Sequence, residues 1–356
     1  MTVAAESSLS SSEFRETTQL DWEALGAYLQ EQGMRFGGAA SVREFAGGYG
    51  NWNFLIDVDG APLVLRRPPA GPLPPGANDM RREYNVLSRL WEAFPLAPKA
   101  RLLCEDESII GAAFLLMEYR EGLIVRDRLP ESLTHCGREL SELLIGTLAA
   151  LHDVDADQVG LGSMGRPDGF LERTVNGWLK RADVACGGTP PAAVFELGEW
   201  LEDNLADEGD CTLLHSDYKL DNMILQAGRP IRVSAVIDWD MCTRGDPLLD
   251  LATLLSYWTE AGDPPAMHEL AQMPTAAPGF LCREKAAELY AKRTGRDLSD
   301  FMFYRVLAMF KLGVVFLQLH ARYLRGQITN DRFKGFRKLA EGLLDFALVV
   351  SAGKVF

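Results

Sequence analysis

Residues 213–240 decide the fold, and they read LLHSDYKLDNMILQAGRPIRVSAVIDWD. Two apolar runs on either side of the turn AGRP predict a β-hairpin. A hairpin returns its ends to one place, so we expect Asn222, before the first strand, to lie near Asp238, after the second. Asp217 precedes them in the chain and should lie beside them. Mg²⁺ prefers oxygen ligands and takes few of them from the protein. The stretch therefore predicts a magnesium site next to a further carboxylate.

The spacing of these polar residues matches that of a kinase catalytic loop. His215, Asp217 and Asn222 fit H-x-D-x-x-x-x-N, in which the Asp orients or deprotonates an attacking hydroxyl and the Asn holds a metal ion. Asp238 follows an apolar strand and takes the place of the metal-binding Asp of D-F-G. The alternative is that three polar residues stand at ordinary loop positions. Because the catalytic-loop, hairpin and metal-Asp spacings all agree, the stretch predicts phosphoryl transfer.

Length and composition narrow the class of protein. The chain has 356 residues, enough for roughly two domains with a core that needs no disulfides. A net charge of −14 excludes a nucleic-acid binder that relies on broad phosphate contacts. Six scattered cysteines without a C-x-x-C pair argue against a zinc ribbon, a thioredoxin-type site and a secreted disulfide framework. The N-terminus lacks the features of a signal peptide, and the apolar stretch 306–319 is too short to span a bilayer, so we expect a cytoplasmic protein without a membrane partner.

Hydrophobic patterning divides the chain near residue 120. Residues 1–19 read as a disordered or loosely packed tail, 20–120 as strands with helices at 20–32 and 80–94, and 121–356 as long helices around the island. The helices expected in the last part span 136–152, 171–181, 192–205, 247–259, 283–294, 298–325 and 331–350. The expected fold class is α+β, with a small β-rich N-terminal lobe and a larger, mainly α-helical C-terminal lobe.

The chain after residue 20 resembles the aminoglycoside phosphotransferase family, whose kinase-like members phosphorylate small molecules. Within that family it is most similar to the branch that includes the kinase-like domain fused to certain acyl-CoA dehydrogenases. Besides the island, the resemblance rests on VLRRPP at 64–69, REY at 82–84, LHDVD at 151–155, GL at 160–161, GDP at 245–247, FKL at 310–312, RY at 322–323 and Gly326. It implies a two-lobed protein-kinase-like fold that uses ATP and Mg²⁺, with the lobes meeting near residue 120 around the nucleotide.

The resemblance implies roles for the residues of the larger lobe. Asp217 is the implied catalytic base, and Asn222 and Asp238 are the implied Mg²⁺ ligands. We expect His215 to brace the loop by hydrogen bonding rather than to transfer a proton. Asp246 and Asp250 resemble positions that stabilise the loop after the metal site. His152, at a helix end, is expected to cap the helix.

Nucleotide-binding roles are implied for the first lobe. The turn Gly47, Gly48, Tyr49, Gly50 and Asn51 is the implied phosphate cover, although a Gly-rich turn alone favours a structural reading.

Arg66 occupies the position where protein kinases place the phosphate-binding Lys, and it keeps the charge with a different donor geometry. Glu83 is its implied ion-pair partner, the alternative being a solvated helix charge. Glu118, Tyr119 and Arg120 resemble the hinge whose backbone meets the adenine.

The acceptor is expected to be a small molecule with a hydroxyl group. Gly245-Asp246-Pro247 follows Asp238 almost at once, which leaves no long activation segment for docking a protein. The branch resemblance implies a hydroxy acid or a hydroxyacyl-CoA thioester. An aminoglycoside or another small alcohol is the alternative, and a nucleotide-binding pseudokinase or regulatory module is the alternative of another class.

Two basic clusters stand out in this acidic chain, and they bind either a ligand or only solvent. One comprises Arg322, Arg325, Arg332, Lys334, Arg337 and Lys338, and the other Arg166, Arg173, Lys180 and Arg181.

Overall fold

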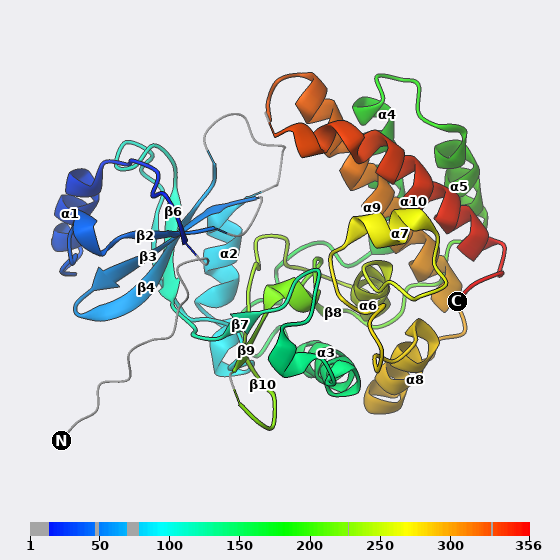
Figure 1. Cartoon of the computed structure of the whole chain (residues 1–356), viewed down its shortest axis with the longest axis horizontal. Helices are drawn as coiled ribbons and strands as arrows, with labels where there is room; N and C mark the ends of the chain where they lie inside the picture. Colours follow the sequence, from blue (N-terminus) through cyan, green and yellow to red (C-terminus); the bar gives the residue numbers. More distant parts are fainter. Residues whose placement is uncertain (1–13, 47–49, 70–77, 227, 329) are drawn as a thin grey trace. The chain divides into compact units, whose positions relative to one another are not determined.

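The computed structural model describes residues 14–46, 50–69, 78–226, 228–328 and 330–356 (Figure 1). The chain divides into two compact units. Unit 1 comprises Met1–Arg120 with Trp239–Met241, and unit 2 comprises Glu121–Asp238 with Cys242–Phe356. Unit 1 is built around a β-sheet and unit 2 mainly from helices, which confirms the expected α+β class.

Unit 1 contains a six-stranded antiparallel sheet with the strand order β1-β2-β3-β4-β6-β5. Its strands are β1 (Phe14–Arg15), β2 (Arg43–Phe45), β3 (Trp52–Val58), β4 (Ala61–Arg67), β5 (Ala100–Cys104) and β6 (Phe114–Glu118). β3 and β4 pair along their whole length around the turn Asp59-Gly60, the hairpin signal in the sequence. Both turn residues have positive φ angles.

The stretch expected as a tail, 1–19, is partly built into the sheet. Phe14 and Arg15 pair with β2, and the Arg15 Nε donates to the buried Glu44 carboxylate at 2.8 Å. The Thr18 N–H donates to the same carboxylate at 2.7 Å. The expectation is therefore wrong for residues 14–18, because a buried acid needs these donors. Residues 1–13 lie outside the described residues.

The described residues of unit 1 also form two α-helices, α1 (Trp22–Glu31) and α2 (Met80–Leu87). The helix expected over 80–94 ends at Leu87, and a separate 3-10 turn follows at Leu90–Glu92. The Ser88 hydroxyl and the Arg89 guanidinium both donate to the Asn85 carbonyl, at 3.3 and 2.9 Å. These side chains replace the backbone donor that a continuing helix would supply, which explains the early end.

Unit 2 contains eight α-helices in its described residues. They are α3 (Gly137–His152), α4 (Phe170–Ala185), α5 (Ala192–Asp203), α6 (Pro247–Ser256), α7 (Pro265–Leu270), α8 (Arg283–Thr294), α9 (Phe301–Leu324) and α10 (Phe336–Ser351). All seven expected helices are present, and the six-residue α7 was not expected. The Asp246 carboxylate accepts from the Leu248 N–H and Pro247 follows it, so both residues start α6.

α9 is the core helix of unit 2, and α10 runs along it (Figure 1). Gly313 permits this approach, since a Cβ there would come within 2.8 Å of Leu344. Among the described helices, α9 alone is long and apolar enough to cross a membrane, judged by length and composition. The expectation that its apolar stretch is too short to span a bilayer is therefore wrong. Instead, 72% of its most apolar window is buried within the protein, as in the core helix of a globular domain.

The island forms the predicted hairpin from β9 (Met223–Gln226) and β10 (Arg232–Val236), with β7 (Leu123–Ile124) on the other edge of β9. The Ile237 N–H donates to the Asn222 carbonyl at 2.9 Å, so the two ends of the hairpin meet as expected. The preceding strand, β8 (Thr212–Leu214), pairs with β11 (Thr243–Gly245). This arrangement places the loop 215–222 between two small sheets.

Candidate active site

The loop that carries Asp217 is fixed by its neighbours in unit 2. The Asp250 carboxylate on α6 accepts from the backbone N–H groups of His215 and Ser216, at 2.6 and 2.8 Å. The His215 ring bonds the Ile237 carbonyl through Nε2 at 2.9 Å and accepts from the Asp217 N–H through Nδ1 at 3.3 Å. His215 therefore braces the loop against the hairpin, as the sequence predicts.

His152 does not cap its helix with its side chain. The ring is buried and bonds the Tyr290 hydroxyl at 2.7 Å, with the Asp250 carboxylate 3.5 Å from its other nitrogen. The capping expectation is wrong, because the imidazole is oriented toward the interior, where it supports Asp250.

The Asp217 carboxylate is surrounded by donors. Oδ2 lies 2.6 Å from the Lys219 Nζ and 3.3 Å from the Asn222 Nδ2, and Oδ1 accepts from the Tyr257 hydroxyl at 2.9 Å. Burial raises the pKa of Asp217, but the charges of Lys219, Lys311 and His215 outweigh burial and hold the pKa below its ordinary value. The side chain is 23% exposed, so this anionic carboxylate remains open to a small molecule.

The residues expected to hold Mg²⁺ have suitable donor atoms. The Asn222 Nδ2 is bonded to the Asp217 carbonyl at 2.9 Å, so its amide oxygen is the atom that can meet a cation. Asp238 follows β10 with φ at +71°, a backbone conformation that non-glycine residues rarely adopt.

Asp221 lies within electrostatic range of Asp217 and Asp238. The pKa of Asp221 is raised to about 6, and burial is the largest cause. The charges of Asp217 and Asp238 act in the same direction, and the charge of Lys219 opposes them. Its Oδ1 is buried without a hydrogen bond. Within the described residues, no group of three or more His, Cys, Asp or Glu could hold a metal on its own. A few protein oxygens completed by phosphate oxygens are what Mg²⁺ takes at nucleotide sites, so these residues fit Mg²⁺ rather than zinc.

Arg66 and Glu83 form a buried ion pair within unit 1. The Arg66 Nε lies 2.8 Å from the Glu83 Oε2, and the residues are 5% and 0% exposed. This confirms the expected pair and excludes a solvated helix charge. The register of β3 and β4 places Asn53 opposite Arg66, and its amide oxygen accepts from Arg66 at 3.3 Å. The other Glu83 oxygen accepts from the Trp239 N–H at 3.3 Å.

The expected phosphate cover is only partly described. Gly47, Gly48 and Tyr49 lie outside the described residues. Gly50 leads into β3, and the Asn51 side chain is buried between the Asn78 amide, at 2.9 Å, and the Asp240 carboxylate, at 3.3 Å. The Asn51 side chain therefore contacts unit 1 itself, and its nucleotide role stays a prediction.

The hinge expected at 118–120 ends β6. The Glu118 carboxylate accepts from Arg120 at 2.8 Å and from the Lys99 N–H at 3.2 Å, and the Tyr119 ring stacks on Phe45 with 6.4 Å between centroids. All three side chains make contacts within unit 1. The expectation that the backbone of this segment meets adenine stays a prediction.

The structure adds three residues to the candidate site that the sequence analysis missed, Lys219, Tyr257 and Lys311. Lys219 lies two residues after Asp217, and its Nζ is 2.6 Å from the Asp217 Oδ2. The two-residue spacing could have revealed it. Tyr257 and Lys311 come from the end of α6 and the middle of α9, and only tertiary packing brings them to Asp217 and Ser216.

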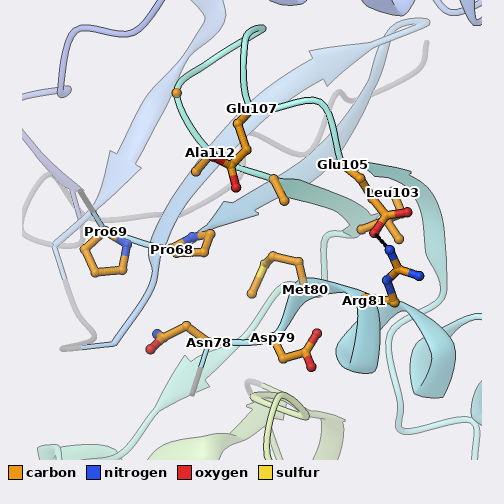
Figure 2. A pocket seen from close by; sticks show the side chains of 12 residues that line it. Pro68, Pro69, Asn78, Asp79, Met80, Arg81, Leu103, Glu105, Glu107 and Ala112 are labelled. Carbon is orange, nitrogen blue, oxygen red and sulfur yellow. Dashed lines mark ion pairs between the residues drawn. The ribbon is translucent and has the colours of Figure 1, made fainter. Parts of the chain in front are cut away.

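One described cavity is not part of this site. It lies in unit 1 and has a volume of about 360 Å³ (Figure 2). Figure 2 shows Asn78, Asp79 and Met80 on one side of it and Pro68 on another. None of the residues expected to act in phosphoryl transfer lines this cavity.

The two basic clusters lie in part on neighbouring elements of unit 2. α4 packs on α9, where Arg325 donates to the Val184 carbonyl at 3.5 Å, and the Arg337 charge acts on the Cys186 thiol. Arg181 in turn lies within electrostatic range of Lys311. Arg173 binds protein groups instead, since it donates to the carbonyls of Asp168 and Arg166, before α4.

Residues 41–285 match the model of the phosphotransferase enzyme family. The chain belongs to this family. It is 34% identical over 327 residues to acyl-CoA dehydrogenase family member 11 of Gallus gallus, covering 88% of this chain and 41% of that protein. It is 30% identical over 337 residues to family member 10 of Mus musculus, covering 94% and 31%. The phosphotransferase chain thus spans less than half the length of these curated relatives.

Solved structures share its fold. A putative aminoglycoside phosphotransferase from Ralstonia eutropha superposes with a TM-score of 0.72 at 28% identity, covering 93% of this chain and 99% of that one. An aminoglycoside phosphotransferase in a ternary complex with AMP-PNP and hygromycin B superposes with a TM-score of 0.59 at 19% identity, covering 93% and 99%. The resemblance and the kinase-like fold inferred from the sequence are confirmed. The roles of single residues in this phosphotransferase stay predictions.

Proposed function

We propose that this small-molecule phosphotransferase moves the γ-phosphate of ATP to a substrate hydroxyl, with Asp217 as the base. The observation that carries the proposal is the Asp217 carboxylate itself. It is anionic, partly exposed, and held by Lys219, Tyr257 and Asn222. A carboxylate fixed in this way can accept the proton of an attacking hydroxyl without reorganising.

The proposal also assigns residues to the nucleotide. Asn222 and Asp238 would hold Mg²⁺, which when bound neutralises charge on the phosphates. Arg66, fixed by Glu83, would supply a further positive charge for the phosphates, as the Lys–Glu pair of kinases does. The relative bound to AMP-PNP supports ATP as the donor.

For the acceptor we propose a hydroxy acid or a hydroxyacyl-CoA thioester. Lys219 lies against Asp217, and Lys311 donates to the backbone carbonyl of Ser216. Arg181 is within electrostatic range of Lys311. We expect these cations to favour an acceptor that carries a carboxylate or phosphate group. The acyl-CoA dehydrogenase names of the relatives support the same class.

An aminoglycoside or another small alcohol is the second candidate, and it is favoured by the relative that was solved with hygromycin B. An ADP-release screen separates the candidates by setting 4-hydroxyacyl-CoA thioesters, free hydroxy acids, aminoglycosides, choline and sugars side by side. Turnover of a thioester but not of an aminoglycoside supports the first candidate.

The variant Asp217→Asn tests the base. We expect it to lose turnover by a factor of about 10² to 10⁴ while its affinity for ATP is retained, because the amide cannot accept the proton. Asp203→Asn, at an exposed end of α5, is the control and should leave turnover unchanged. Full turnover by Asp217→Asn would remove Asp217 from the mechanism. Tight ATP binding with no acceptor phosphorylated by the unaltered protein would favour a pseudokinase.

A further inference from the structure

Lys311 is a cation within the apolar core helix of unit 2. Its neighbours Phe310 and Leu312 are buried, and α9 packs along α10. Burial lowers the pKa of Lys311, and the nearby Asp217 and Asp250 carboxylates oppose that effect. Placing an ammonium group here costs free energy, so a specific partner is expected. That partner is the Ser216 carbonyl, to which the Lys311 Nζ donates at 2.6 Å.

Ser216 has a backbone conformation that needs support. Its φ angle is +68°, in the left-handed region that disfavours residues with a Cβ. The Asp250 carboxylate accepts from its N–H at 2.8 Å, and Lys311 donates to its carbonyl. Two charged side chains of opposite sign, from α6 and α9, therefore hold the two polar backbone groups of this one residue.

The peptide bond between Ser216 and Asp217 is held at both of its polar atoms. Lys311 binds the carbonyl, and the His215 Nδ1 accepts from the Asp217 N–H at 3.3 Å. Because a peptide unit is planar, fixing both atoms fixes the plane. A turn of that plane would change the φ angle of Asp217 and swing its carboxylate away from Lys219 and Tyr257.

We propose that Lys311 is a positioning residue for phosphoryl transfer, which aims the Asp217 carboxylate by clamping the Ser216 carbonyl from α9. The proposal rests on the proposed role of Asp217 as the base. Lys311 acts through the backbone carbonyl of Ser216, so its removal should disturb the reaction geometry more than the affinity for either substrate.

The test compares Lys311→Met, which keeps most of the length of the side chain without the charge, with Lys311→Arg, which keeps a charged donor. Lys292→Met, on the exposed face of α8, is the matched control. The assay is ADP release with ATP and a 4-hydroxyacyl-CoA thioester, or slow ATP hydrolysis where no thioester turns over. We expect kcat to fall about 100-fold for Lys311→Met, because a misplacement of a reacting group by about 1 Å costs about that factor. For Lys311→Arg, which can still donate to the Ser216 carbonyl, we expect a loss of about tenfold or less. KM for both substrates should stay within about threefold, and the control should match the unaltered protein.

Several outcomes would overturn the proposal. One is an unchanged kcat for Lys311→Met, and another is a rise in the KM of the thioester at unchanged kcat, which would make Lys311 a substrate-binding residue. A third is an equal loss for Met and Arg. If Lys311→Met gives no cooperative thermal transition, Lys311→Gln replaces it, and an unchanged kcat would again contradict the clamp.

The unaltered protein and Asp217→Asn are assayed beside these variants. If Asp217→Asn abolishes transfer while Lys311→Met keeps the kcat of the unaltered protein, only the clamp fails. If Asp217→Asn keeps its activity, the proposed function fails first, so the two failures are distinguishable.

Discussion

Asp217 keeps its negative charge in a partly buried place where desolvation alone would favour the neutral acid. Three cationic or polar neighbours reverse that balance: Lys219 at 2.6 Å from Oδ2, then Lys311 and His215 at longer range. The Tyr257 hydroxyl occupies the other oxygen, Oδ1. Burial also raises the pKa of Tyr257, so the phenol stays a donor rather than a second anion. The result is a single carboxylate that is ionised and fixed in direction.

Asp250 supports this loop through a charge of its own. Burial raises the pKa of Asp250, but the hydrogen bond and charge of His152, the charge of His215 and the His215 N–H outweigh burial, and the pKa falls below the ordinary 3.8. Lys311 is the further charged group near it. A lowered pKa means that the folded state prefers the ionised acid. The ionised Asp250 carboxylate therefore stabilises the folded state fully above pH 3.8, and this stabilisation is lost as the pH falls through the lowered pKa.

We expect Asp250→Asn to lose about 3 kcal/mol of unfolding free energy at pH 7, because the neutral amide cannot replace a buried charged acceptor. The difference in unfolding free energy between Asp250→Asn and the unaltered protein should become smaller only below about pH 4, where Asp250 itself becomes protonated. Thermal melts across an acid series measure this difference. Asp345→Asn, on the exposed face of α10, is the control. A difference that stays constant down to pH 2 would contradict a role for the Asp250 charge.

At the scale of elements, β4 and α2 are joined by the ion pair of Arg66 and Glu83. Both side chains are buried, so each charge depends on the other for compensation. The β3–β4 register adds Asn53 to the pair. The pair thus fixes α2 on the sheet and directs the guanidinium that we assign to the nucleotide phosphates.

We expect Glu83→Gln to destabilise the protein by about 3 kcal/mol, because it leaves the Arg66 charge buried without its partner. Its affinity for ATP should also fall. Glu92→Gln, an exposed change in the next turn, should change neither property. In the double variant Arg66→Met with Glu83→Met, the unfolding free energy should recover while ATP affinity stays low. Urea unfolding and calorimetric ATP titration measure the two properties, and unaltered ATP binding by the double variant would contradict the nucleotide role of Arg66.

At the scale of the whole molecule, unit 1 is completed by residues from a distant part of the chain. Trp239–Met241 belong to it, although the residues on both sides of them belong to unit 2. Trp239 is fully buried, packs edge-on against Phe94 with 6.1 Å between centroids, and donates its N–H to Glu83. The Asp240 carboxylate accepts from Asn51. Unit 1 is therefore not a contiguous segment of sequence.

We expect Trp239→Ala to lower the unfolding free energy by about 3–5 kcal/mol, the cost of removing a large buried aromatic side chain. Hydrogen exchange should show the loss of protection in β3, β4 and α2 rather than in α9 and α10. Trp239→Phe should cost less, because it keeps an aromatic ring against Phe94. Equal loss of protection in both units would contradict the assignment of Trp239 to unit 1.

Local patterns located most of the elements and the loop 215–222, because the signals for these features lie within short stretches of the chain. Periodicity located the helices of unit 2, and the spacing of His215, Asp217 and Asn222 with the hairpin turn located the loop. Local patterns failed where side-chain contacts decide where a helix ends. The Asn85 carbonyl accepts hydrogen bonds from the side chains of Ser88 and Arg89, and α2 therefore ends earlier than its periodicity predicts.

Only the tertiary structure decided which residues surround Asp217. Tyr257 lies 40 positions from Asp217, and Lys311 lies 95 positions from Ser216. No periodicity or spacing relates residues so far apart. Their contacts come from the packing of α6 and α9 around the loop, where burial makes each charge depend on a partner that the chain supplies from elsewhere.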